Sequence, residues 1–296
     1  MKPRDVAEYV FLALVWGVSF LVLLQVVEAF GFIGAVAFRS LVAGGSLLGL
    51  AAIRRRRLDF SAGWRPYFIV GATTVAGQLI GLSYATPRIG TAMAAILVAT
   101  IPLFSMVISQ LWGLERFTPQ GVLGLVLGVV GIVLLVGFPA VALTDTFIVG
   151  CIAMLFGSFC AAYGSNYTSR YLRDTGSFEV TAGSFFFGGA MTVPLLIVVP
   201  VPGPLEASDF LYLFIAGAVM SGLTYVMYFR LVSVIGPTRT ISVEFVVTVV
   251  AVLVGVFVLH EPLNGLQVVG AAVIILGCLL VLGLVPLGSL TRIEAE

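Results

Sequence analysis

An acidic side chain inside an apolar stretch is the most chemically informative residue of this chain. Glu244 shares a helical face with Thr240 and Thr248, because residues four apart on a helix are neighbours. A carboxyl group in such a segment is costly and rarely idle. Glu244 is expected to bind the ammonium group of a ligand, to take up a proton, or to pair with Arg239 or Arg39.

A tryptophan and a serine form a second polar site. Trp16 lies about ten residues into the first apolar stretch, roughly 15 Å deep at the helical rise. Its indole N–H needs an acceptor, and its ring can stack on an aromatic or cationic ligand. Ser19 follows one turn later on the same face. The pair is expected to line a pocket; the alternative is that Trp16 only packs a helix crossing.

Two further polar groups lie inside apolar segments. Gln78 follows Thr74 by one turn, and its amide both donates and accepts hydrogen bonds, which suits a carboxylate or an ammonium group. A hydrogen bond between helices is the equal alternative for Gln78. Arg39 lies roughly 12 Å into the second apolar segment, where a structural intramembrane charge is favoured over a ligand role.

Two stripes of polar and aromatic residues repeat the spacing i, i+3, i+4, i+7, which places each stripe on one helix face. The stripes are Tyr163, Asn166, Tyr167 and Arg170, and Ser221, Thr224, Tyr225 and Tyr228. Tyr163, Ser221 and Tyr225 are the cavity candidates. Tyr167, Tyr228 and Arg170 fall near a helix end, where Tyr and Arg are common at a membrane interface.

The elements that carry these residues are predicted to be membrane-spanning helices. The 296 residues are 60% hydrophobic and 10% charged, with a mean hydropathy of +1.16, whereas soluble domains carry about 25% charged residues. A span needs roughly 20 apolar residues. Ten helices are predicted, at residues 6–27, 31–53, 65–84, 89–112, 120–137, 147–169, 178–199, 209–230, 238–259 and 265–285. The expected class is an all-α membrane protein.

Basic residues fall almost entirely on one side of this arrangement. With a cytoplasmic N-terminus, that side holds Lys2, Arg4, Arg54, Arg55, Arg56, Arg57, Arg65, Arg116, Arg170, Arg173, Arg230, Arg239 and Arg292. The other side holds only Arg88. This asymmetry predicts that both termini are cytoplasmic in a multi-pass protein of the plasma or inner membrane. The first span is too long for a signal-peptide core and is expected to remain in the protein.

The chain matches itself at an offset of 146 residues. The matched pairs are Gly90 and Gly236, Glu115 and Glu261, Gly124 and Gly270, Gly131 and Gly277, Leu134 and Leu280, and Gly137 and Gly283. The repeat predicts two five-helix halves, residues 1–140 and 141–296, and an odd helix count inverts the second half. Inverted repeats are typical of secondary transporters, which bind substrate near the midplane between the halves.

Several motifs together resemble the drug/metabolite transporter superfamily, in particular its EamA-type ten-helix members. They are Trp16-Gly17-Val18-Ser19-Phe20, Phe38-Arg39-Ser40, the block from Gly90-Thr91-Ala92 through Ile101-Pro102-Leu103 to Glu115, the glycine-spaced helix 120–137, and Glu261. In overall likeness the chain is similar to the bacterial aromatic amino-acid exporters. The resemblance implies export across the inner membrane from a central cavity by alternating access.

Other functions find little support in the residues. Lys2 is the only lysine, so the chain contains no phosphate-binding loop for ATP. His260 is the only histidine and is expected in a loop, while Cys151, Cys160 and Cys278 suit buried small hydrophobic residues. No cofactor, metal or nucleic acid is expected, and an intramembrane enzyme is disfavoured. An exporter of another metabolite or drug class and an uncoupled uniporter stay open, as does the choice between monomer and homodimer.

Overall fold

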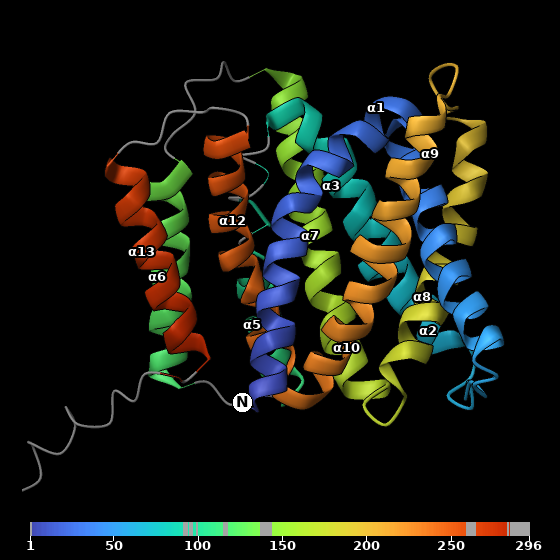
Figure 1. Ribbon diagram of the computed structural model, residues 1–296. Coiled ribbons are helices and arrows are strands. Elements are labelled where there is room, and N and C mark those ends of the chain that lie inside the picture. The colour runs from blue at the N-terminus through green and yellow to red at the C-terminus, as the bar shows by residue number, and fades with distance from the viewer. Residues whose placement is uncertain are drawn as a thin grey trace, which may run out of the picture.

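The computed structural model describes residues 2–90, 94, 97–98, 100–114, 118–136, 144–258, 265–282 and 284. All regular secondary structure in these ranges is helical, which confirms the predicted class. Five helical segments are long and apolar enough to cross a membrane: Pro3–Ile53, Trp64–Ile89, Asp145–Tyr171, Ser177–Ile197 and Ala207–Ile235. Shorter apolar helices accompany them in a bundle (Figure 1). The predictions for Glu115, His260 and Glu261 lie outside the described residues.

The first element, α1 (Pro3–Ile53), contains two of the predicted helices. They meet at Gly31, whose φ of 70° and ψ of 166° break the helix. Glycine reaches this backbone conformation without the steric cost that a Cβ would add. Figure 1 shows α1 running from the N-terminus to the opposite end of the molecule, bending there and returning. The predicted boundary between residues 27 and 31 is therefore confirmed as a sharp bend.

The next predicted helix has three parts: α2 (Trp64–Val70), a π-helical segment η1 (Gly71–Gly77) and α3 (Gln78–Ile89). It continues past the predicted end at residue 84 and through Pro87. A proline in the last turn removes few helical hydrogen bonds, so the helix ends only where Gly90 takes a φ of 81°.

Helix α5 (Ile101–Leu111) follows a turn at Thr100, so the predicted helix 89–112 is interrupted among its described residues. Helix α6 (Pro119–Val136) begins as expected. The Thr118 hydroxyl accepts a hydrogen bond of 3.1 Å from the amide of Gly121, and proline fills the first helical position.

The second half begins with α7 (Asp145–Tyr171), which Thr144 caps through a 3.2 Å bond from the amide of Phe147. Helix α8 (Ser177–Thr192) was expected to run to residue 199, but it tightens into the 3₁₀ segment η2 (Val193–Ile197). Pro194 provides the physical reason, since it lacks the N–H that an α-helical turn would use.

The next crossing contains a second π-helical segment. This crossing consists of α9 (Ala207–Phe214), the π-helical η3 (Ile215–Leu223) and α10 (Thr224–Ile235), and it ends at Gly236. The crossing extends past the predicted end at residue 230.

The predicted helix 238–259 is divided into α11 (Pro237–Ile241) and α12 (Val243–Val258). The Ser242 hydroxyl at the break donates to the Arg239 carbonyl at 2.7 Å, a local bond that competes with the helical pattern. Helix α13 (Gly265–Val281) completes the described fold.

The offset of 146 residues recurs in the local geometry of the two halves. Gly90 and Gly236 have φ values of 81° and 90°. The π-helical segments end at equivalent positions, so that α3 begins at Gln78 and α10 at Thr224. Helices α6 and α13 also begin at equivalent positions. The sequence repeat is therefore a repeat of backbone structure.

The last helices of the two halves, α6 and α13, pack on each other through glycines. A Cβ on Gly124 would lie 2.7 Å from the Gly277 carbonyl oxygen, and one on Gly131 would lie 2.9 Å from that of Gly270. Rising residue numbers in α6 meet falling numbers in α13, so these equivalent helices run antiparallel. Small residues allow helices to approach closely where lipid gives no hydrophobic drive. The glycine face is thus a contact between the halves.

Candidate functional site

A cavity opens between α1, α3, α10 and α12, where the two halves meet. It is lined by Trp16, Ser19, Phe20, Leu23, Arg39, Gln78, Leu79, Leu82, Val98, Tyr225, Glu244 and Val247. The structure thus brings together five of the seven residues that the sequence singled out for binding. The cavity is small: the centres of water molecules can occupy only about 50 Å³ of it, which is room for a few water molecules.

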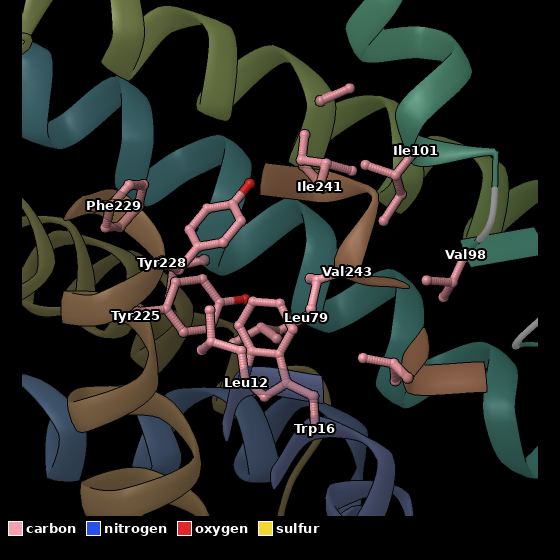
Figure 2. Packing of buried hydrophobic residues seen from close by; sticks show 14 of the residues in the cluster. Leu12, Trp16, Leu79, Val98, Ile101, Tyr225, Tyr228, Phe229, Ile241 and Val243 are labelled. Carbon is pink, nitrogen blue, oxygen red and sulfur yellow. The ribbon is translucent and has the colours of Figure 1, made fainter. Parts of the chain in front are cut away.

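Trp16 forms the aromatic wall of the cavity. Its Nε1–H donates a 3.1 Å hydrogen bond to the Thr224 hydroxyl, so the buried indole finds the acceptor that it needs. The Trp16 ring lies 5.3 Å from the ring of Tyr225 and 5.5 Å from that of Tyr228, as centroid distances. Figure 2 shows these three rings close together, with Leu12 and Leu79 beside them. The contacts hold one face of the cavity in place.

Arg39 reaches the cavity from the second leg of α1. Its Nε–H donates to the Ser221 hydroxyl at 2.5 Å, and Ser221 in turn donates to the Ala216 carbonyl at 2.8 Å. That second bond spans five residues and lies within the π-helical η3. A Cβ on Gly217 would lie 2.9 Å from the Arg39 carbonyl oxygen, so glycine lets η3 approach α1 closely. The π-helical turn therefore positions the acceptor for Arg39.

Glu244 lies in the first turn of α12, directly after the break at Ser242. Its side chain is buried and lines the cavity. Among the described residues no ion pair within 4.0 Å includes Glu244 or Arg39, so the pairing that the sequence left open for Glu244 does not form. Both charged groups instead face the same cavity.

Gln78 and Ser19 complete the polar lining. Gln78 is the first residue of α3, directly after the π-helical η1. The Ser19 hydroxyl donates to the Trp16 carbonyl at 2.7 Å, which satisfies a helix group and leaves an oxygen acceptor beside the cavity.

The remaining predicted residues lie elsewhere. Ser221 does not line the cavity but holds Arg39. Tyr163 belongs to an aromatic cluster with Trp112 at 5.3 Å and Tyr167 at 6.2 Å, and the cavity lining does not include it. The prediction that Tyr163 lines the cavity is therefore not supported. Tyr228, expected at the interface, is instead buried against Trp16.

Equivalent positions of the two halves line the same cavity. Leu79 and Tyr225 are 146 residues apart, as are Val98 and Glu244, and all four line it. Once one member of such a pair is known, the repeat offset of 146 residues identifies the other member from the sequence. Thr224, the acceptor for Trp16, is likewise the equivalent of Gln78 and could have been found in the same way.

Comparisons with known proteins agree with this architecture. A sequence model of the EamA-like transporter family matches residues 9–137 and 148–283. Protein PecM of Dickeya dadantii (strain 3937) is 27% identical over 281 residues, covering 93% of this chain and 90% of PecM. The inner membrane transporter YedA of Escherichia coli (strain K12) is 28% identical over 281 residues, covering 91% of this chain and 88% of YedA.

A solved crystal structure supports the same fold. It superposes with a TM-score of 0.78 over 96% of this chain and 99% of its own, at 18% sequence identity. At that identity the likeness bears on the fold alone.

Proposed function

Because this chain belongs to the EamA-like transporter family and is an inner membrane transporter rather than an enzyme, we propose that it exports aromatic and other apolar amino acids by alternating access. The observation that carries the proposal is the composition of the cavity between the halves. Aromatic rings, an amide, a carboxyl group and a guanidinium group face one small space.

The lining provides a partner for each part of an aromatic amino acid. Trp16 and Tyr225 offer ring faces, which attract aromatic groups and cations. Glu244 offers a carboxylate for the ammonium group. Arg39 and Gln78 offer N–H donors for the carboxylate. A charge buried in a membrane is costly unless something compensates it, and a zwitterionic substrate would compensate both charges.

The cavity must enlarge to admit such a substrate, since it now has room for only a few water molecules. We expect the two halves, residues 1–140 and 141–296, to move as rigid bodies relative to each other. The antiparallel α6 and α13 support an inverted repeat, and equivalent residues of the halves line the cavity. Rocking of one half against the other would open it to each side in turn.

The proposed orientation places both termini in the cytoplasm. Figure 1 shows the N-terminus, the turn after α1, the turn between α7 and α8 and the junction of α10 with α11 at one end of the bundle. The arginines of these segments therefore gather at that end, and this distribution supports a cytoplasmic assignment.

Flux into liposomes tests the proposal. The purified protein is reconstituted, and uptake of labelled tryptophan and phenylalanine is compared with uptake of glutamate, a sugar and a nucleobase, with and without a pH gradient. Flux of the aromatic amino acids well above the others is expected. Flux of only another class of compound would be consistent with a transporter but would reject aromatic amino acids as its substrates. Flux of the aromatic amino acids that does not respond to the pH gradient would indicate a uniporter that is not coupled to protons.

A further inference from the structure

A second, apolar groove lies on the surface of the helix bundle, away from the central cavity. It is lined by Leu48, Phe60, Gly63, Trp64, Tyr67, Ala182, Gly183, Phe186 and Phe187, which come from α1, α2, α8 and the turn between α1 and α2. The groove has about 330 Å³ open to the centre of a water-sized sphere. Trp64 and Phe186 are 59% and 49% exposed, so the groove is open to the surroundings. Its lining suits a hydrocarbon chain.

Arginines flank this groove at the end of the bundle where α2 and the N-terminus lie (Figure 1). Arg56 donates to the Glu179 carboxylate at 3.0 Å, and its guanidinium lies 4.6 Å from the ring centroid of Phe178. Glu179 and Phe178 are in the first turn of α8, one turn before the groove residues Ala182 and Gly183. This contact holds Arg56, a member of the arginine run 54–57, one helical turn from the groove.

The arginines around Arg56 carry charge that the neighbouring acids do not neutralise. No ion pair among the described residues includes Arg54, Arg55, Arg57 or Arg65. Arg65 lies 5.9 Å from the ring of Trp64, at the edge of the groove. Asp59 is engaged by the amide of Ser61 at 2.9 Å. The groove is therefore apolar inside, with Arg65 at its edge and the arginine run 54–57 nearby in the chain.

We propose that this groove binds one anionic phospholipid. An acyl chain fills the apolar interior, and the phosphate lies among Arg54, Arg57 and Arg65. Guanidinium groups bind phosphate through paired N–H donors. Clusters of basic residues next to a membrane helix also attract anionic lipids, by about 1 kcal/mol for each residue.

The positive-inside rule by itself would account for arginines at this end of the protein. It requires only positive charge and gives no reason for an apolar groove beside that charge. The lipid site requires both, so the two explanations predict different responses to substitution.

Native mass spectrometry of the purified full chain tests the proposal by titration with phosphatidylglycerol and with phosphatidylcholine of the same acyl chains. Wild-type protein is expected to bind one phosphatidylglycerol at least tenfold more tightly than phosphatidylcholine. The triple variant Arg54→Gln, Arg57→Gln, Arg65→Gln is expected to lose most of that preference. The matched variant Arg4→Gln, Arg170→Gln, Arg239→Gln removes the same charge from residues whose contacts lie away from the groove, and it is expected to retain the preference.

Two further variants separate the role of the arginines from that of the apolar interior. Replacing Arg54, Arg57 and Arg65 by lysine keeps the positive charge and is expected to weaken the preference only in part. Leu48→Trp fills the groove and is expected to weaken binding of both lipids while the thermal midpoint of the protein is maintained. Equal binding of the two lipids by wild-type protein, or an unchanged preference in the glutamine triple variant, would overturn the proposal. If glycerol phosphate displaced bound phosphatidylglycerol as effectively as the lipid itself does, the acyl chain would contribute nothing to binding. The site would then bind only an anion, which would also overturn the proposal.

Discussion

At the scale of single residues, the site depends on how each buried polar group is satisfied. Trp16 is held by one hydrogen bond to Thr224 and by two tyrosine rings. Arg39 is held by one bond to Ser221. Glu244 and Arg39 direct a carboxyl group and a guanidinium group at the cavity, and neither has a partner ion among the described residues. A ligand that carries groups complementary to both would be favoured at this site.

Substituting Trp16 separates its ring from its hydrogen bond. Trp16→Phe keeps an aromatic face but loses the bond to Thr224, whereas Trp16→Ala loses both. An aromatic contact is worth roughly 1 kcal/mol, which is about fivefold in an equilibrium constant. We therefore expect the KM for tryptophan flux to rise about fivefold in the alanine variant and less in the phenylalanine variant. Trp112→Ala, in the aromatic cluster away from the cavity, is the control. An unchanged KM in a folded Trp16→Ala protein would remove Trp16 from the binding site.

Glu244→Gln tests whether this carboxyl group carries protons. If it does, the variant loses uptake driven by a pH gradient but keeps exchange of labelled for unlabelled substrate, because exchange needs no net proton movement. Flux in liposomes measures both activities. Glu28→Gln, which alters an exposed acid near the bend of α1 and outside the cavity, is expected to keep gradient-driven uptake. A pH profile of Glu244→Gln that matches wild type would assign the coupling to another group.

At the scale of elements, the helices reach the cavity through local departures from α-helical geometry. The π-helical η1 and η3 end directly before Gln78 and Thr224, and a break at Ser242 precedes Glu244. Such interruptions occur frequently at functional sites, because they re-aim side chains and provide points of bending. The two π-helical segments end at equivalent places in the two halves, so each half carries the same departure from α-helical geometry beside the cavity.

The contact between α6 and α13 predicts which glycines tolerate a side chain. A Cβ on Gly277 would lie 2.7 Å from the Gly124 carbonyl oxygen, which cannot move without its helix. Gly277→Ala is therefore expected to lower the thermal midpoint by several degrees in a detergent melting assay. On the same face of α6, a Cβ on Gly121 would meet only the Thr118 hydroxyl, at 3.4 Å. Gly121→Ala is expected to leave the midpoint unchanged or to raise it, and equal losses in both variants would contradict the packing argument.

At the scale of the whole molecule, the two halves are tied together at the end that holds the N-terminus. Arg230 of α10 donates to Glu8 at 2.6 Å and to Asp5 at 3.0 Å, and both acids lie on α1. One turn further into the bundle, the hydroxyls of Tyr9 and Ser242 lie 3.0 Å apart. These contacts lie between that end and Trp16, and we expect them to close the path from there to the cavity.

Breaking this connection is expected to favour opening at that end. Arg230→Gln removes both ion pairs, so a cysteine introduced at Ser19 should react several times faster with a polar thiol reagent added from the N-terminal side. Arg4→Gln is the matched control, because Arg4 pairs with Glu8 on the same helix and does not connect the halves. Equal labelling rates in the two variants would show that the connection does not control access.

Much of the architecture follows from the sequence alone. Runs of about 20 apolar residues require helices in lipid, because each backbone N–H and C=O must be satisfied within its own segment. Glycine and proline mark the ends, as at Gly31 and at the Thr118 cap. The repeat offset is visible in the residues and recurs in the backbone at Gly90 and Gly236. Trp16 and Glu244 were identifiable because a polar group deep in an apolar segment needs a partner or a cavity.

The tertiary structure decided which polar groups meet. Tyr163 and Tyr225 both belong to polar aromatic stripes of the same spacing, yet only Tyr225 reaches the cavity. Arg39 lines the cavity rather than serving only as a brace, because Gly217 lets η3 approach α1 closely. The π-helical turns and the break at Ser242 rotate side chains by amounts that regular helical spacing cannot anticipate. Helical periodicity specifies which residues share a face, whereas the packing between helices determines what that face meets.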